Sequence, residues 1–133
     1  MSLSPSAPRK DWLFWAVAAI AVLTVVSGLT QVFAPQWILA LLAAESTATT
    51  NHFFGIVGMF MALFGGLVLN TLFGSPQQSV PVLWAALQKL GAVVAVTLGV
   101  RHQIFSKLAL LVALTDLVSA VIMWAYWSRV RKL

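Results

Sequence analysis

Two full charges stand in the middle of long apolar stretches, and their chemistry sets the first constraint on the chain. Lys89 lies within the apolar run Val82–Val100, and Asp116 lies within the run Leu108–Trp127. A lone charge at mid-bilayer costs at least about 2.5–3.5 kcal/mol. The short polar turn Arg101–Lys107 joins the two runs, so they form antiparallel neighbours that bring the two charges to similar depths. The spacing therefore predicts an intramembrane Lys89–Asp116 ion pair.

Three interpretations of these two charges remain open at the level of sequence. In the first, Lys89 and Asp116 form a static ion pair that fixes the register of two helices. In the second, the pair is protonatable or grips a substrate during transport. In the third, the lysine side chain extends to the cytoplasmic headgroups and never meets the carboxylate.

A second set of polar residues falls at the helix ends on one side of the predicted membrane and forms a candidate ligand mouth. Its main members are Glu45, Asn51, His52, Arg101 and His102, and Gln103 and Lys107 belong to the same side. Their scattered spacing matches no metal-ligand motif, so no metal site is predicted. His52, which precedes Phe53 and Phe54, offers a contact for a pigment, a quinone or a lipid headgroup. The simpler interpretation is a set of hydrated residues at the membrane interface.

Catalysis and nucleic-acid binding have little support in the composition. The chain has no cysteine, and no Ser/His/Asp set is legible, so a non-enzymatic protein is expected. Only 8% of its 133 residues are charged and 61% are hydrophobic, whereas soluble domains carry about 25% charged residues. The net charge of +5 reflects basic residues that sit mostly at the two ends of the chain, which suits anionic lipid headgroups rather than nucleic acid. The sequence requires no cofactor.

The apolar runs predict one all-α integral membrane domain, residues 1–133, built as a four-transmembrane-helix bundle. A span needs about 20 apolar residues to cross about 30 Å of hydrocarbon. Pro35 ends the first span, and Gln36–Ala44 is apolar but too short to cross. It predicts a short interfacial helix between spans one and two, with an extended loop as the alternative. The predicted spans are residues 12–33, 50–73, 82–100 and 107–127.

Small residues mark the faces through which the spans are expected to pack, because they let two backbones approach closely in lipid. The sequence does not distinguish a partner helix in the same chain from one in another chain. The predicted packing stripe of the second span, at i+4 steps, is Gly58, Ala62, Gly66 and Asn70. The small and polar side of the third span is Gln88, Gly91, Ala92, Ala95 and Gly99.

Charge asymmetry predicts the orientation. Four spans place both termini on one side, and spans one–two and three–four form two hairpins. The opposite side carries two basic residues, Arg101 and Lys107. The positive-inside rule therefore predicts cytoplasmic termini, in a bacterial inner membrane or a thylakoid. The terminal side carries five basic residues, Arg9, Lys10, Arg129, Arg131 and Lys132.

The order of these features resembles a known group of proteins. The first span ends in FAPQWILALLA, the second contains FFGIVGMFMALFGG, the third contains LWAALQKLGAVVAVTLG, and the fourth contains LLVALTDLVSAVIMWAYW. This pattern is similar to small four-helix bacterial membrane proteins grouped as DoxX-like or DUF4345-like. The resemblance implies a four-helix membrane bundle and no established reaction. Some DoxX-type proteins are linked to redox or membrane-stress partners, but this chain has no cysteine to carry such chemistry.

The expected function is that of an accessory or scaffolding subunit, which contacts the lipid bilayer and packs against other membrane proteins or against itself. The first alternative is an oligomeric small-molecule or ion carrier that uses the Lys89–Asp116 pair. The second is a membrane protein that binds a lipid, a quinone or a pigment near His52.

Overall fold

The computed structural model describes residues 10–74 and 79–132, and helices are the only regular secondary structure within these ranges. Arg9, which enters the predicted charge asymmetry, and residues 75–78 of the loop before the third span lie outside the described residues. The predicted all-α bundle is confirmed. In order, the helices are α1 (Trp12–Phe33), α2 (Pro35–Leu41), α3 (Ala48–Phe73), α4 (Val80–Arg101) and α5 (Ala109–Val130).

Local chemistry explains where the first helices begin and end. The Asp11 carboxylate caps α1 by accepting a hydrogen bond from the Phe14 backbone N–H at 3.2 Å. Pro35 ends α1 and begins α2, because proline lacks the N–H that a helix interior needs but fits the first helical turn. Thr47 and Thr50 form a reciprocal capping box at the start of α3.

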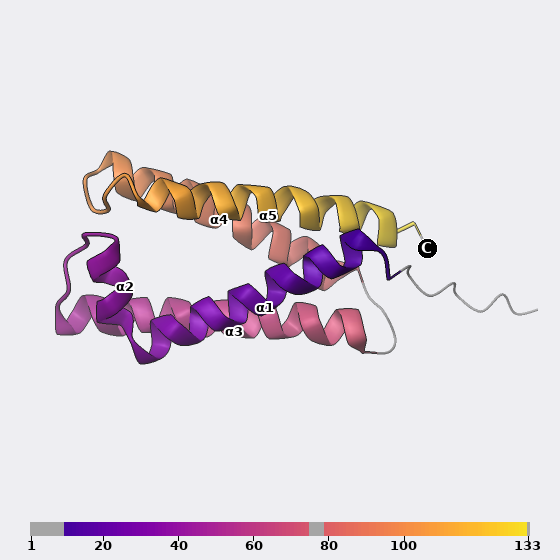
Figure 1. Cartoon of the computed structure of the whole chain (residues 1–133), viewed down its shortest axis with the longest axis horizontal. Coiled ribbons are helices and arrows are strands. Elements are labelled where there is room, and N and C mark those ends of the chain that lie inside the picture. The colour runs from indigo at the N-terminus through magenta and orange to yellow at the C-terminus, as the bar shows by residue number, and fades with distance from the viewer. Residues whose placement is uncertain (1–9, 75–78, 133) are drawn as a thin grey trace, which may run out of the picture.

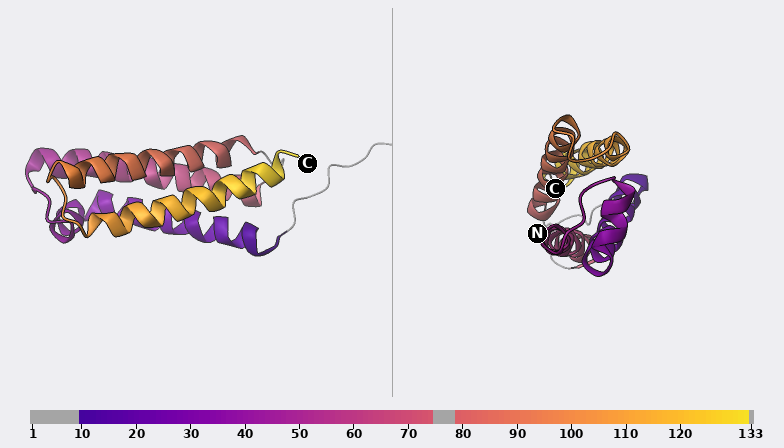
Figure 2. Two further views of the ribbon diagram at one scale, coloured as in Figure 1. Left: turned by 90° about the horizontal axis from the view of Figure 1, so that it is seen from above. Right: turned by 90° about the vertical axis from the view of Figure 1, so that its left-hand side faces the viewer.

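The four long helices form two antiparallel pairs, as the two predicted hairpins require. Helix α1 packs along α3, and α4 packs along α5, while contacts between the pairs are fewer. Figure 1 shows the pairs converging at the end that holds the C-terminus and the start of α1, and separating toward the other end. The end-on view in Figure 2 shows the same two groups, with α2 beside α1 and α3.

The core that joins the two pairs lies at the terminal end of the bundle. Phe14 is fully buried there. The centroid of its ring lies 5.4 Å from that of Phe73 on α3, in an edge-on contact, and 6.4 Å from that of Tyr126 on α5, in a tilted contact. Val17 of α1 and Val82 of α4 are also fully buried in this core. One cluster therefore holds all four long helices together at this end.

Helices α1 and α3 approach closely through glycine, but not along the whole predicted stripe. A Cβ atom on Gly28 would lie 2.7 Å from the Ala62 backbone nitrogen. Residues spaced seven apart on α3, namely Gly58, Gly65 and Leu72, are buried. Helix α1 of the same chain is thus the partner of Gly58 and Ala62.

Gly66 and Asn70, the later members of the predicted stripe, do not join this contact within the chain, and their place in a packing face stays a prediction. A Cβ on Gly66 would have no neighbour within 4 Å, and Asn70 is exposed. Each i+4 step turns the helix about 40° beyond a full circle, because a turn takes 3.6 residues. The later members of the predicted stripe therefore rotate away from the face that Gly58 and Ala62 share.

The outer surface of the bundle is apolar along its length. All four long helices are long and apolar enough to cross a membrane. Large side chains such as Leu23, Leu63, Val94 and Val121 are about 60% exposed, in positions that water would penalise and that lipid accommodates. The chain is therefore a small multi-pass membrane protein whose helices contact the bilayer.

Candidate functional site

The two mid-helix charges meet inside the bundle. Lys89 Nζ donates a hydrogen bond to Asp116 Oδ1 at 3.2 Å. The side chains are 7% and 14% exposed, respectively. The arrangement in which Lys89 extends away to the headgroups is thus not the one observed. The antiparallel packing of α4 on α5 brings the two residues together across 27 positions of sequence.

Burial makes this pair energetically sensitive. Two charges removed from water attract each other strongly, but removing one of them leaves the other unpaired in a low-dielectric interior, at a cost of about 3–5 kcal/mol. Replacing both with apolar residues of similar volume is often nearly neutral. The geometry alone therefore fits both a static register pair and a pair that changes partner during transport.

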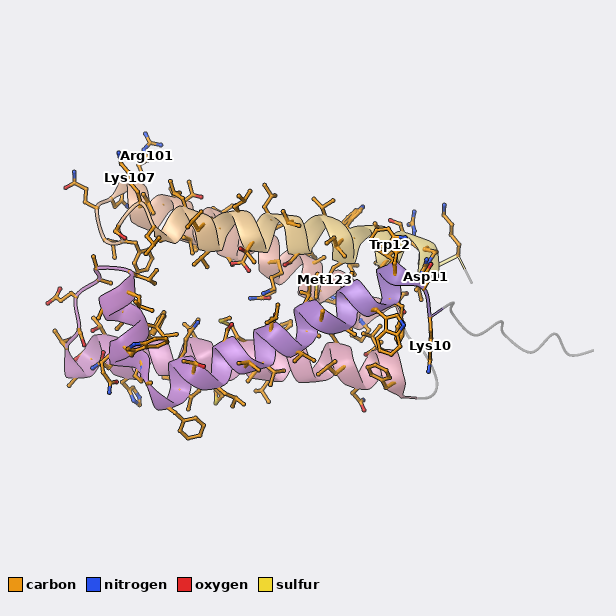
Figure 3. All side chains as sticks on the ribbon, in the orientation of Figure 1. Lys10, Asp11, Trp12, Arg101, Lys107 and Met123 are labelled. Atoms are coloured by element: carbon orange, nitrogen blue, oxygen red, sulfur yellow. The ribbon has the colours of Figure 1, made fainter. Side chains whose placement is uncertain are left out.

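Lys89 also faces the other helix pair. It lines a small cavity of about 10 Å³, together with Thr24 of α1, Gln88 of α4 and Met123 of α5. Figure 3 labels Met123 where the two helix pairs come together. A volume of this size corresponds to about one water molecule. Residues of all four long helices, α3 included through Gly65, thus surround the lysine side of the ion pair.

A second ion pair closes the terminal end of the bundle. Arg129 of α5 donates two hydrogen bonds to the Asp11 carboxylate, one of them at 2.9 Å to Oδ1. The hydrogen bonds from Arg129 lower the pKa of Asp11 from its ordinary value of 3.8 to about 2. The acid lies at the N-terminus of α1 and the base near the C-terminus of α5, where each also complements its helix dipole.

The contact between Asp11 and Arg129 was not predicted from the sequence. A signal was present, since Asp11 is the only acid among the basic residues at the two chain ends. Four spans bring those ends to the same side, where an acid and a nearby arginine are natural partners. Figure 3 shows Asp11 at the end where the chain terminates.

The structure does not gather the candidate ligand mouth into one site. Glu45, His52 and His102 are exposed, and the half-buried Asn51 accepts a hydrogen bond from Ser46 at 2.9 Å. Across the described ranges, no hydrogen bond or ion pair joins the α3 members to Arg101 or His102. Within the same ranges, no three side chains of metal-binding type come close enough to hold an ion.

The end of the bundle opposite the termini, where the two helix pairs separate, is called the open end here. It contains a larger cavity. Its volume is about 390 Å³, and the lining includes Arg101, Gln103 and Lys107 of the predicted mouth but not Glu45, Asn51, His52 or His102. A hydrogen bond of 2.9 Å from the Ser106 backbone N–H to the Leu42 carbonyl ties the α4–α5 turn to the end of α2. The full lining is Ala43, Val100, Arg101, Gln103, Phe105, Ser106 and Lys107.

Comparisons with known protein families, with curated proteins and with solved structures find no match to this chain. The resemblance to DoxX-like and DUF4345-like proteins therefore gains no support from them and stays a prediction.

Proposed function

We propose that this chain is a non-enzymatic accessory or scaffolding subunit that packs against other helices in the membrane. The observation that carries the proposal is a small-residue face on α4 that its own chain leaves open. A Cβ on Gly91 would have no neighbour within 4 Å, and Ala95, one turn later, is exposed. Small residues four apart allow close helix approach in lipid.

This face differs from the glycine contact between α1 and α3. Gly28 and Gly58 already pack within the chain, since each lies against the backbone of the partner helix. Gly91 and Ala95 lack such a partner among the described residues. A helix from another subunit, or from a second copy of this chain, fits the open face without displacing any contact of the bundle.

The test adds bulk to the open face and measures assembly. The double variant Gly91→Leu/Ala95→Leu is expected to fold normally, because the added side chains enter open space. Native mass spectrometry of mildly solubilised membranes should show the native chain in an assembly and the double variant without the partner subunit. The matched control is Ala19→Leu/Ala125→Leu, which enlarges two exposed alanines on α1 and α5 and should keep the assembly. A native protein that is strictly monomeric, with no co-purifying protein, contradicts the proposal.

We propose, further, that both termini face the cytoplasm, in a bacterial inner membrane or a thylakoid. The charge asymmetry supports this orientation. Lys10 lies at the same end as the C-terminus, whereas Arg101 and Lys107 lie at the opposite end (Figure 3). Because the native chain has no cysteine, single cysteines at Lys10 and Gln103 report the two sides cleanly. A membrane-impermeant maleimide applied to intact cells should label only the cysteine at Gln103.

A second candidate function is supported by the surroundings of Lys89. An ion or small-molecule carrier needs a charged group near mid-membrane that contacts a pathway, and Lys89 lines a cavity between the helix pairs. Single and double variants Lys89→Met and Asp116→Leu separate the functions. Transport lost while folding is intact supports a carrier. Folding lost in each single variant and recovered in the double supports a static pair within a scaffold.

A further inference from the structure

The open end of the bundle carries a basic cavity that the accessory role does not explain. Two cationic side chains, Arg101 and Lys107, line its volume of about 390 Å³, and no acidic residue does. Neither cation has an ion-pair partner among residues 10–74 and 79–132. Glu45, which lies in the connection between α2 and α3, is exposed and does not line the cavity.

We propose that this cavity binds the phosphate group of an anionic phospholipid headgroup. Arg101 supplies a planar guanidinium fork that suits phosphate oxygens, and Lys107 supplies a second positive charge. Both residues reach the cavity from the same turn, between α4 and α5, and Figure 3 shows them side by side at one corner of the molecule.

The neighbouring helix ends do not neutralise these cations. Carbonyl groups at the end of a helix carry partial negative charge, and α2 and α4 both end beside the cavity. Several of those carbonyls already accept backbone hydrogen bonds: Leu98 from His102, Gly99 from Ile104, and Leu42 from Ser106. The helix dipole accounts for one basic residue, Arg101 in the last turn of α4, but it does not account for Lys107.

Two turns with left-handed backbone conformations form the walls of the cavity. The two non-glycine residues with positive φ in the described ranges are Ala43 at 52° and Gln103 at 61°, and both line the cavity. Each follows the end of a helix, where the left-handed conformation reverses the chain. Phe105 packs its ring against Gly99, where a Cβ would lie 2.5 Å from the ring. This contact holds the α4–α5 turn against α4, and the Ser106–Leu42 hydrogen bond ties the same turn to the end of α2.

The apolar neighbours of the cavity favour a lipid over free phosphate. Ile104 and Leu108, on either side of Phe105 and Lys107, are 57% and 52% exposed. Leu41, at the end of α2, is 51% exposed. Such side chains anchor both turns in the acyl region and so place the cavity at headgroup depth. The 22 residues of α4 span about 33 Å, which brings Arg101 to the membrane surface.

Native mass spectrometry of the full chain, released from nanodiscs with equal parts phosphatidylglycerol and phosphatidylcholine, tests the proposal. One phosphatidylglycerol should be retained in preference to phosphatidylcholine. Near a membrane surface each basic residue contributes about fivefold in affinity, so Arg101→Gln/Lys107→Gln should reduce the preference about 30-fold. The conservative variant Arg101→Lys/Lys107→Arg should retain most of it.

The control removes the same charge elsewhere. Arg131→Gln/Lys132→Gln, at the opposite end of the chain, should leave the preference nearly unchanged, and circular dichroism should show equal helicity for every variant. An equal loss in this control would overturn the proposal, since general surface charge would then explain binding. Absence of any phosphatidylglycerol preference would also overturn it. Binding of inorganic phosphate without retention of the lipid would overturn the assignment to a headgroup.

Discussion

Gly28 is the position at which one added methyl group should test the α1–α3 contact. In Gly28→Ala the new Cβ would lie 2.7 Å from the Ala62 backbone nitrogen and 3.1 Å from Met61 Cβ, and it would also meet the Gly58 carbonyl oxygen. Carbon atoms in contact normally lie about 3.5–4.0 Å apart. A rotamer change cannot relieve the clash because two of the three neighbours are backbone atoms, so the helices must separate.

The expected cost of Gly28→Ala is about 1–3 kcal/mol in the free energy of unfolding, which is typical of overpacking a close contact. Gly66→Ala and Gly91→Ala are the matched controls, since a Cβ at either position has no neighbour within 4 Å. These controls should be neutral or stabilising by up to about 1 kcal/mol, because alanine is the better helix former.

Unfolding in mixed micelles of increasing denaturing-detergent fraction, followed by circular dichroism, measures these differences. The structure predicts that Gly28→Ala unfolds first and that Gly66→Ala matches or exceeds the native chain. Native stability in Gly28→Ala, or a loss in Gly66→Ala as large as in Gly28→Ala, would refute the packing register. The second result would favour the i+4 stripe instead.

Two further predictions concern the helix ends. Because the folded pKa of Asp11 is lowered to about 2, its stabilising contribution is complete above its ordinary pKa of 3.8 and is lost as the pH falls from about 4 toward 2. A pH titration of unfolding should therefore show Asp11→Asn losing this acid-dependent step, whereas Glu45→Gln keeps it; an unchanged step in Asp11→Asn would contradict the Arg129 pairing. Thr47→Ala removes one half of the α3 capping box and should cost about 1 kcal/mol, measured in the same unfolding assay, with the exposed Thr49→Ala as the control that should change little.

The sequence predicted the elements well because each rests on a strong local signal. Apolar runs define the four long helices, and Pro35 defines the break before α2. Lys89 and Asp116 were predicted to meet because an unpaired charge is costly in hydrocarbon and a short turn joins their helices. The observed distance of 3.2 Å between Nζ and Oδ1 follows from the same constraint.

Contacts between helices were harder to predict, because lipid-facing and buried positions are both apolar in a membrane protein. Gly65 lies next to Gly66 in the sequence, yet only Gly65 is buried. Small-residue spacing alone cannot decide between neighbours that differ by 100° around the helix. Arg101, Gln103 and Lys107 were predicted to share one side of the membrane, but the part that Ala43 plays in the cavity was missed, since it depends on tertiary contact between the α4–α5 turn and the end of α2.

The central claim is that hydrocarbon surrounds the exposed apolar side chains of the four long helices. Val94, midway along α4 and 60% exposed, provides the most direct test as a single cysteine in reconstituted vesicles. A bimane label at this position should be quenched by lipids brominated on their acyl chains and not by aqueous iodide, whereas a label at Gln103 should show the reverse. Quenching of the Val94 label by iodide, to the same extent as the Gln103 label, would contradict the membrane-embedded bundle.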